Sequence, residues 1–453
     1  METPSPHYGF DIESTRVNIT AMKLKPAKKI KGTVTIPGDK SISHRVAMIA
    51  AQADGISKLS NFATSQDCRS TIDCLRALGV DIKSANSSYI IRGRAQLDSP
   101  SLPLDCGNSG TTMRVLSGVL AAQDFSSRLV GDESLSARPM KRIIEPLEKM
   151  GALIESKEGR PPLLIRGTPN IKTISYRLPV ASAQVKSAVL FAAINAQGRT
   201  EVIEATQSRD HTERLFEDFG VPVKVEQHDN EPWSISIDGP ARFKARDMII
   251  PGDSSSAAYF VVAAMFLSDS QLSLERVGLN PTRIEYLSVL RSCGADIKID
   301  YESDRMKEPF GTIKVRSGHS PASKTANEIG GEKIPSLIDE LPLLAVVGSQ
   351  LNGGLTIRDA GELRHKETDR LRATALNLRA MGAAVEELED GLVIDGPIKL
   401  RGARIESFGD HRIAMAFSIA ALLADGDSYI ADSDCVNISF PEFFKLLHSL
   451  ISD

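Results

Sequence analysis

The feature that most constrains this chain is an internal repeat. An amphipathic stretch, a glycine and a short alternating stretch recur along the sequence, and successive glycines are 69 to 88 residues apart. These glycines are Gly79, Gly151, Gly220, Gly294 and Gly382. Each stands where a helix ends in a left-handed residue, which glycine adopts without steric cost. The alternation that follows predicts a half-buried strand. The chain therefore repeats one unit of helix, glycine and strand.

A second series runs out of phase with the first. Each of its members is a polar or glycine-containing turn followed by an apolar stretch of small residues. The six members, marked by one residue each at intervals of 69 to 84, are at Ser41, Gly110, Gln184, Ser255, Asp339 and His411. Both series therefore indicate a unit of about seventy residues that occurs six times. Extra residues around 315–333 account for the one long interval in each series.

These units predict the fold class. Each contains two helices and several short strands, which is typical of an α/β or α+β protein. The stretches rich in Ala and Val have no broad polar face, so we expect them at the centre, with strands and amphipathic helices outside. A chain of 453 residues exceeds one hydrophobic core. We therefore expect two similar domains of three units each. One large doubly wound sheet is the alternative, and the regular period disfavours it.

Composition excludes several classes of function. The net charge of -4 does not draw in nucleic acid or an anionic membrane. No apolar run approaches the roughly 20 residues of a membrane span. The five cysteines are odd in number and form no CxxC pair, which disfavours a disulfide framework or a zinc site and fits a cytoplasmic protein. Residues 1–21 are polar and predict a loose tail outside the fold.

The starts of the six apolar stretches carry the candidate chemistry. A helix N-terminus presents unpaired N–H groups and partial positive charge, so it binds anions. A single Ser or Asp there is usually only a cap. Six such starts with basic residues beside them favour a shared anion site. GDKSISHR supplies Lys40, Ser41 and Arg45, and GNSGTTMR supplies Gly110 and Arg114.

Four further motifs add charged and polar groups. SARPMKR, RLPVASAQVKSA and SRDHTERL supply Arg138, Ser182, Gln184, Lys186, Arg209 and His211. We interpret His211 as a packed or hydrogen-bonded side chain. The last third supplies Asp339 and Glu340 in IPSLIDELPLL, Lys366, Glu367 and Arg370 in LRHKETDRLRA, and Arg412 in GDHRIAMAF. We expect Lys366 and Arg370 to share one helical face. Taken alone, each motif is also compatible with capping, a surface salt bridge or a solvated charged helix.

Cations outnumber acids among these candidates. Among the candidates that we expect to face the site, two acids, Asp339 and Glu367, are accompanied by seven cations: Lys40, Arg45, Arg138, Arg209, Lys366, Arg370 and Arg412. This excess favours substrates with several negative charges. No HxxxH, HExxH or Cys/His spacing indicates a metal, and no GxGxxG indicates a dinucleotide, so we expect neither metal nor cofactor.

Together these motifs resemble the enolpyruvyl transferase superfamily, and most closely its EPSP synthase family. The resemblance covers about residues 24–450 and includes GDKSxSHR, GNxGTxxR, RPM, SAQxKSA and GDHRxAM in the family's order. GDKS, SAQVK, RDHTE and NPTR are similar to the class II branch. The resemblance implies an inside-out α/β barrel of two domains with three βαβαββ units each. One domain would span 39–251 and the other 22–38 plus 252–453, with the active site in the cleft between them.

The resemblance also implies a reaction. The carboxyvinyl group of phosphoenolpyruvate moves to the 5-hydroxyl of shikimate 3-phosphate, and phosphate is released. Residues matching those that hold shikimate 3-phosphate are Lys40, Ser41, Arg45, Ser182, Ala183, Gln184, Arg209, Asp339 and Lys366. Those matching the phosphoenolpyruvate site are Lys40, Gly110, Arg138, Gln184, Arg370 and Arg412. Family members are usually monomers that act on small molecules without a cofactor.

Three of these residues match catalytic groups. Asp339 would accept the hydroxyl proton, and Glu367 with Lys40 would protonate the methylene carbon. An acid must hold its proton, so we expect burial and the nearby Asp339 to raise the pKa of Glu367.

Two departures and two alternatives accompany the resemblance. Gly110 stands where glyphosate-tolerant class II members can carry alanine, and Ile438 stands where other branches have a lysine. The sister enzyme that uses UDP-N-acetylglucosamine has Asn after the first lysine and a reactive loop cysteine. Here Ser41 follows Lys40, and residues 128–142 contain no cysteine. A non-catalytic module that binds an anionic metabolite would lack Asp339 or Glu367, and both are present.

Overall fold

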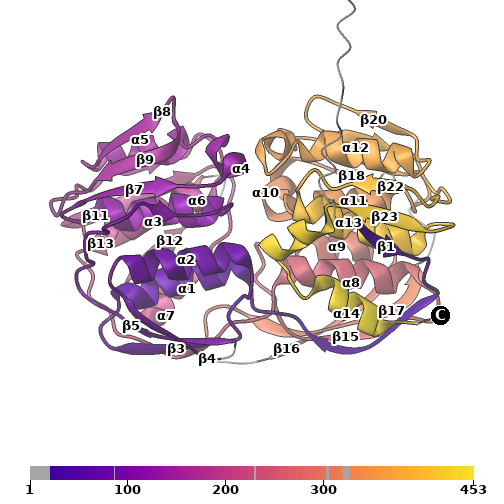
Figure 1. Cartoon of the computed structure of the whole chain (residues 1–453), viewed down its shortest axis with the longest axis horizontal. Helices are drawn as coiled ribbons and strands as arrows, with labels where there is room; N and C mark the ends of the chain where they lie inside the picture. The colour runs from indigo at the N-terminus through magenta and orange to yellow at the C-terminus, as the bar shows by residue number, and fades with distance from the viewer. Residues whose placement is uncertain (1–20, 86, 229–230, 303–305, 320–326, 453) are drawn as a thin grey trace, which may run out of the picture.

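The computed structural model describes residues 21–452 except 86, 229–230, 303–305 and 320–326. Two globular halves lie side by side (Figure 1). Each has its own hydrophobic cluster, one running from Ile42 to Ile250 and the other combining Leu24–Ile36 with Ala257–Leu450. We call residues 39–251 the first lobe, and residues 21–38 with 252–452 the second lobe.

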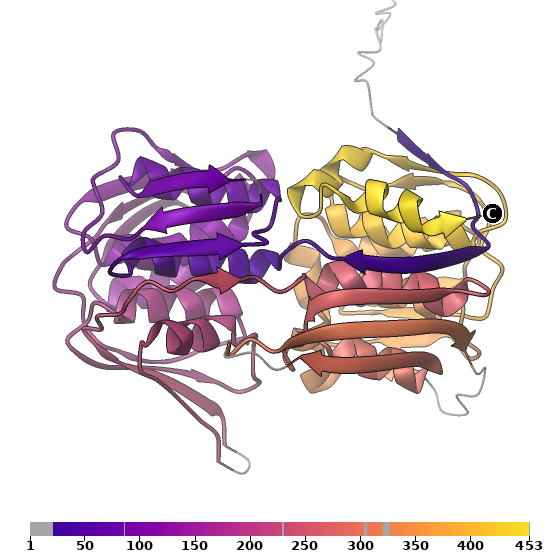
Figure 2. The same cartoon turned by 90° about the horizontal axis from the view of Figure 1, so that it is seen from below.

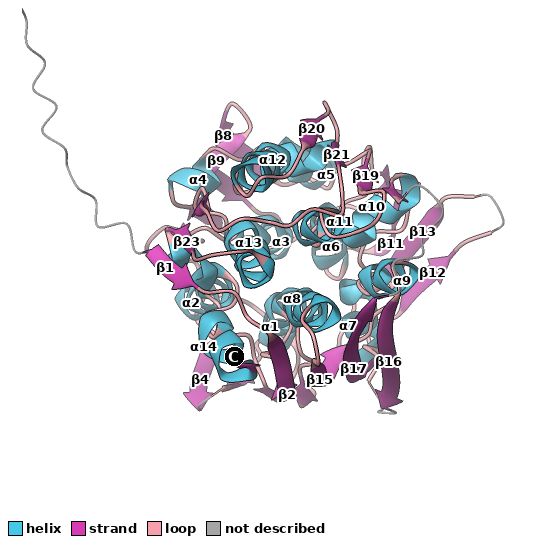
Figure 3. Cartoon of the chain, turned by 90° about the vertical axis from the view of Figure 1, so that its right-hand side faces the viewer, coloured by secondary structure: helices cyan, strands magenta, loops and turns pink. Residues whose placement is uncertain are grey.

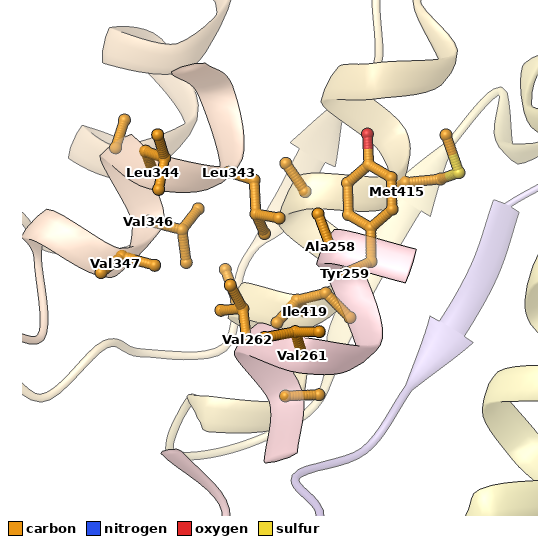
Figure 4. Packing of buried hydrophobic residues seen from close by; sticks show 14 of the residues in the cluster. Ala258, Tyr259, Val261, Val262, Leu343, Leu344, Val346, Val347, Met415 and Ile419 are labelled. Atoms are coloured by element: carbon orange, nitrogen blue, oxygen red, sulfur yellow. The ribbon is translucent and has the colours of Figure 1, made fainter. Parts of the chain in front are cut away.

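Six central helices form the cores of the lobes, three in each. They are α1 (Lys40–Gln52), α3 (Gly110–Ala121), α6 (Ala183–Ala193), α8 (Ser254–Phe266), α11 (Leu341–Gly348) and α13 (His411–Leu423). Their Ala- and Val-rich sequences have no wide polar face, and nearly every residue in them is buried. In the second lobe, α8, α11 and α13 interdigitate through Val262, Val346 and Ile419 (Figure 4). The expectation that these stretches lie at the centre is confirmed.

Six amphipathic helices lie outside this core. They are α2 (Gln66–Ala77), α5 (Lys141–Lys149), α7 (His211–Phe219), α9 (Glu285–Ser292), α12 (Arg370–Ala380) and α14 (Phe443–Leu450). The first five each end close to one of the repeated glycines, whose φ angles lie between 82° and 108°. The remaining short helices are α4 (Glu133–Ser136), α10 (Ile334–Leu337), η1 (Gly331–Lys333), η2 (Gly361–His365) and η3 (Ser433–Ile438).

Six small sheets cover the outside, as the end-on view of the second lobe illustrates (Figure 3). Four have the same order, in which a short first strand is parallel to the second and two antiparallel strands follow. The sheets of the first lobe are β14-β3-β5-β4, β6-β7-β9-β8 and β10-β11-β13-β12. Their strands are β3 (Ile56–Ser60), β4 (Asp81–Ala85), β5 (Ser88–Arg92), β6 (Leu104–Asp105), β7 (Ser126–Val130), β8 (Leu153–Lys157), β9 (Arg160–Arg166), β10 (Ser175–Arg177), β11 (Gly198–Glu204), β12 (Val223–Glu226), β13 (Trp233–Gly239) and β14 (Met248–Ile249).

The second lobe continues the pattern with sheets β16-β17-β15-β2-β24, β18-β19-β21-β20 and β1-β23-β22. Their strands are β1 (Ala21–Leu24), β2 (Lys29–Thr35), β15 (Gln271–Gly278), β16 (Ala295–Glu302), β17 (Phe310–His319), β18 (Glu328–Ile329), β19 (Leu355–Ile357), β20 (Val385–Glu387), β21 (Leu392–Ile394), β22 (Arg404–Glu406), β23 (Ser428–Ala431) and β24 (Ile451–Ser452). The βαβαββ unit is complete in β6 to β9, β10 to β13 and β18 to β21.

The chain crosses between the lobes twice, and the two crossovers exchange first strands. β2 precedes α1 in the sequence but pairs in parallel with β15 of the second lobe, while β14 precedes α8 and pairs with β3 of the first. The crossovers run antiparallel beside each other (Figure 2). The amide of Asp39 donates to the Pro251 carbonyl at 2.8 Å, and that of Asp253 donates to Pro37 at 2.9 Å. This paired connection positions the starts of α1 and α8 next to each other.

Two segments distinguished in the sequence, the predicted tail and the extra polar stretch, are only partly described. Residues 1–20 of the predicted tail lie outside the described residues, but Ala21 begins β1 and pairs with Ala431. Ala21, which the prediction assigned to the tail, therefore belongs to the fold. Of the extra stretch at 315–333, residues 320–326 also lie outside the described part.

Candidate active site

All six central helices begin at one cleft between the lobes. The cleft encloses about 430 Å³, which is in the range of small-molecule sites. All of the residues that the resemblance assigned to substrate binding or catalysis line it: Lys40, Ser41, Arg45, Gly110, Arg138, Ser182, Ala183, Gln184, Arg209, Asp339, Lys366, Glu367, Arg370 and Arg412. Residues at the helix starts are therefore gathered by the sixfold repeat, because each repeat points one helix N-terminus at the same place.

The start of α1 supplies two cations of different character. Lys40 pairs with Asp67 at 2.9 Å, and although burial opposes the charged form, Asp67 raises the pKa of Lys40. Arg45 is 3% exposed and donates to the Thr212 hydroxyl at 2.9 Å. Within the described residues, no carboxylate oxygen lies within 4.0 Å of its guanidinium. Burial lowers the pKa of Arg45 to about 10, so it stays charged at neutral pH.

The starts of α3 and α6 meet through a hydrogen-bonded amide. Gln184 accepts from Arg114 at 3.0 Å and donates to Thr111 at 2.9 Å, which fixes the orientation of the amide. Gly110 lies beside the same arginine. A Cβ at Gly110 would approach Arg114 Nη1 to 2.6 Å and Arg138 Nη1 to 3.4 Å. Glycine at this position thus lets two guanidinium groups approach the helix N-terminus.

Asp339 has three cationic partners, more than any other acid of the cleft among the described residues. Its carboxylate contacts Arg209 at 2.6 Å, Arg412 at 3.1 Å and Arg370 at 3.5 Å. Arg209 comes from the first lobe and the other two from the second. Burial favours the neutral form, but these arginines hold the pKa of Asp339 well below its usual range. The next residue, Glu340, occupies the N-cap position of α11 and makes no side-chain cap.

Glu367 overturns one expectation. It contacts Arg370 at 2.5 Å and Arg138 at 3.4 Å. Burial would raise its pKa, but the charges of Arg370 and Arg138 hold the pKa of Glu367 well below the usual value. The prediction that the pKa of Glu367 is raised was therefore wrong for the protein without substrates. The sequence did not reveal that two arginines converge on this carboxylate.

Two other expectations need correction, and one is confirmed. α12 begins at Arg370, and Lys366 lies before it with extended backbone at φ -86° and ψ -153°. The two therefore do not share a helical face, although both line the cleft.

Lys186 is wholly buried in ion pairs with Glu204 and Glu213, each at 2.7 Å, and does not line the cleft. His211 is hydrogen-bonded and buried, as interpreted.

Two residues of the site were not identified as candidates from the sequence. Asp67, at the start of the outer helix α2, binds Lys40 and lines the cleft. Arg283, within NPTR, is 2% exposed and joins the two helix caps, Asp39 at 3.1 Å and Asp253 at 3.6 Å. NPTR was noticed as a pattern, but only the tertiary structure shows what its arginine contacts.

The described residues lack both a metal-binding cluster and a membrane-spanning helix. No group of three or more His, Cys, Asp or Glu side chains could hold a metal ion. None of the helices in this part of the chain is long and apolar enough to cross a membrane.

Comparison with known proteins places this geometry in a family. The profile of the EPSP synthase (3-phosphoshikimate 1-carboxyvinyltransferase) family matches residues 24–447. The 3-phosphoshikimate 1-carboxyvinyltransferases of Solibacter usitatus and Koribacter versatilis are 47% and 48% identical. These matches cover 94% and 95% of this chain and 99% of each relative.

Solved structures of other proteins resemble this fold as well. An EPSP synthase from Acinetobacter baumannii superposes with a TM-score of 0.81 at 38% identity, over 96% of this chain and all of the other. The enolpyruvyl transferase NikO from Streptomyces tendae has a TM-score of 0.75 at 17% identity, with 95% of this chain and 97% of NikO covered, and shares the fold. The chain therefore belongs to the EPSP synthase family, the transferases that move the enolpyruvyl group of phosphoenolpyruvate to shikimate 3-phosphate.

Proposed function

We propose that the cleft divides its two substrates between two overlapping sets of residues. Shikimate 3-phosphate is held by Lys40, Ser41, Arg45, Ser182, Ala183, Gln184, Arg209, Asp339 and Lys366. Phosphoenolpyruvate is held by Lys40, Gly110, Arg138, Gln184, Arg370 and Arg412. The observation that carries this proposal is the convergence of six helix N-termini and these cations on one cleft. Two phosphorylated anions carry several negative charges, and the helix N–H groups and cationic side chains gathered here supply the hydrogen-bond donors that bind them.

Asp339 acts as the base for the 5-hydroxyl of shikimate 3-phosphate. Its lowered pKa supports the ionised form, which a base requires. Three arginines also make it a weak base in the structure described. Substrate phosphates and carboxylates compete for those arginines, and as each arginine turns to a substrate, the pKa of Asp339 rises toward a useful value.

Glu367 acts with Lys40 as the acid for the methylene carbon. The same competition applies, because Arg138 and Arg370 belong to the phosphoenolpyruvate set. Once these cations face the substrate, burial raises the pKa of Glu367 and favours its protonated form. Protonation of the methylene builds cationic character at the adjacent carbon, and the hydroxyl oxygen attacks there to give a tetrahedral intermediate. Loss of a proton from the new methyl group, together with cleavage of the C–O bond to phosphate, then restores the carboxyvinyl double bond. Arg138, Arg370 and Arg412 then neutralise the leaving phosphate.

The lobes act as two domains that close over the substrates, with the crossovers as hinges. Arg209 with Asp339 and Arg138 with Glu367 join the lobes directly over the cleft, which supports closure as part of catalysis. We also propose that the protein works as a cytoplasmic monomer on small molecules alone. Its net charge of -4 offers no general attraction to nucleic acid or to an anionic membrane.

Phosphate release by the purified protein tests this function. Phosphoenolpyruvate and shikimate 3-phosphate are supplied together and singly, with EDTA present throughout. We expect release only with both substrates and no effect of the chelator. Release with UDP-N-acetylglucosamine in place of shikimate 3-phosphate would favour the sister enzyme. Binding of both substrates with no release would favour a module that only binds anionic metabolites.

A further inference from the structure

The guanidinium of Arg45 is held by neutral oxygens from three helices. Nε donates to Thr212 Oγ1 at 2.9 Å, Nη1 to the Ser41 carbonyl at 3.0 Å, and Nη2 to Ser187 Oγ at 3.0 Å. Arginine has five N–H donors, so two remain, one on each terminal nitrogen. Two N–H groups of this kind form the fork that matches the two oxygens of a carboxylate or phosphate.

The donor and acceptor roles of the hydroxyl groups around Arg45 can be assigned in only one way. Ser187 donates to the Ala183 carbonyl at 2.6 Å, so its oxygen is left as an acceptor. Thr212 lies 2.6 Å from Ser187 and must donate its proton there. The remaining lone pairs of Ser187 and Thr212 then receive Nη2 and Nε of Arg45. The chain of hydrogen bonds therefore sets the rotation of the guanidinium as well as its position.

The charge of Arg45 is buried, and among the described residues no carboxylate oxygen lies within 4.0 Å of its guanidinium, although the more distant charge of Glu213 partly offsets the effect of burial on the pKa of Arg45. Thr212 and Ser187 are each 1% exposed, and the arginine itself is 3% exposed. Burying a cation among neutral groups is costly unless an anion joins it. The other arginines of the cleft that contact an acid, such as Arg209 and Arg370, differ in this respect. An oxyanion of the substrate is the partner that this arrangement fits.

We propose that Ser187 and Thr212 are positioning residues for shikimate 3-phosphate, because they hold Arg45 with its two remaining N–H donors directed at an oxyanion of that substrate. This inference rests on the proposed function. Arg45, Ser187 and Thr212 lie on α1, α6 and α7, all in the first lobe. The fork is therefore complete within one lobe and does not depend on contacts between the lobes.

Calorimetric binding of shikimate 3-phosphate, without phosphoenolpyruvate, tests the proposal. Thr212→Val and Ser187→Ala should each weaken binding by about tenfold or more, since each removes a hydrogen bond to a charged group. Thr212→Ser keeps the hydroxyl and should bind as the unaltered protein does. Ser117→Ala is the matched control, because Ser117 is also buried and donates to the carbonyl four residues earlier, at 2.7 Å, outside the cleft.

Steady-state kinetics separate positioning from a general loss of structure. A positioning role raises the KM for shikimate 3-phosphate while kcat and the KM for phosphoenolpyruvate stay within about twofold. Unchanged binding in both variants, or equal weakening of both substrates, would overturn the inference. Failure of the unaltered protein to bind shikimate 3-phosphate would instead refute the proposed function. Shikimate, which lacks the phosphate, identifies the oxyanion: weakened shikimate binding assigns the fork to the carboxylate, and unaffected shikimate binding assigns it to the phosphate.

Discussion

The two lobes share one architecture but present different chemistry to the cleft. In the first lobe, Arg45 and Gln184 are fixed by hydroxyl, carbonyl and arginine groups. In the second lobe, the acids Asp339 and Glu367 are interleaved with arginines, of which Arg370 contacts both. The repeat thus supplies the scaffold of helix N-termini, while the few residues at each start differentiate the lobes. We expect substitution of Arg45 or Gln184 in the first lobe to weaken binding, and substitution of Asp339 or Glu367 in the second lobe to slow turnover.

Asp339→Asn should cause the largest effect on turnover. If turnover did not fall, the contrast drawn between the two lobes would fail. The amide keeps the size of the side chain but cannot take a proton, so turnover should fall by roughly a hundredfold or more. Binding of shikimate 3-phosphate should be retained and the protein should still fold, but the melting temperature at neutral pH should fall, because the amide does not form ion pairs with the three arginines. Single-turnover rates and calorimetry measure the two separately. Near-normal turnover would remove Asp339 as the base.

Arg138→Ala tests whether the first lobe contributes to the phosphoenolpyruvate set. The side chain is 8% exposed, and its guanidinium contacts Glu367 across the cleft. Loss of a charged hydrogen-bond donor should raise the KM for phosphoenolpyruvate by about tenfold. The affinity for shikimate 3-phosphate should stay close to normal. Equal loss for both substrates would show that the two sets are wrongly divided.

Acid should loosen the pairing of the lobes. The pKa values of Asp339 and Glu367 lie well below their ordinary values of 3.8 and 4.5. Groups with a lowered folded-state pKa stabilise the protein above the unfolded value, and that stability is lost as the pH falls through the folded value. The melting temperature should therefore drop as the pH is lowered below about 4.5. Asp339→Asn should show a smaller drop, and an identical drop would mean that other groups dominate.

Arg142→Ala should have the smallest effect. Arg142 of the first lobe makes bonds of 2.7 Å and 3.1 Å to Glu362 of the second, but the two side chains are 48% and 37% exposed. Exposed pairs contribute at most about 1 kcal/mol. We expect kcat and both KM values to change by less than about threefold. A loss as large as that of Arg138→Ala would show that this pair at the cleft mouth controls closure.

Local signals explain why much of the site could be predicted. The glycines that end helices and the polar residues that start them are read from a few neighbouring positions, and the starts hold most of the cleft residues. Asp67 and Arg283 could not be found in this way. Asp67 meets Lys40 across 27 residues of sequence, and Arg283 meets Asp39 across 244. Neither separation in the sequence corresponds to a helical or strand period, so only tertiary packing brings these partners together.

By itself, the sequence determined the sixfold unit, the buried central helices and the set of residues at their N-termini. These follow from periodicity and from the local conformational preferences of glycine and polar caps. The tertiary structure alone decided the exchange of first strands between the lobes and the ion-pair partners of each charged side chain. It also decided the lowered pKa of Glu367, because electrostatic energies depend on distances between groups that are remote in the chain.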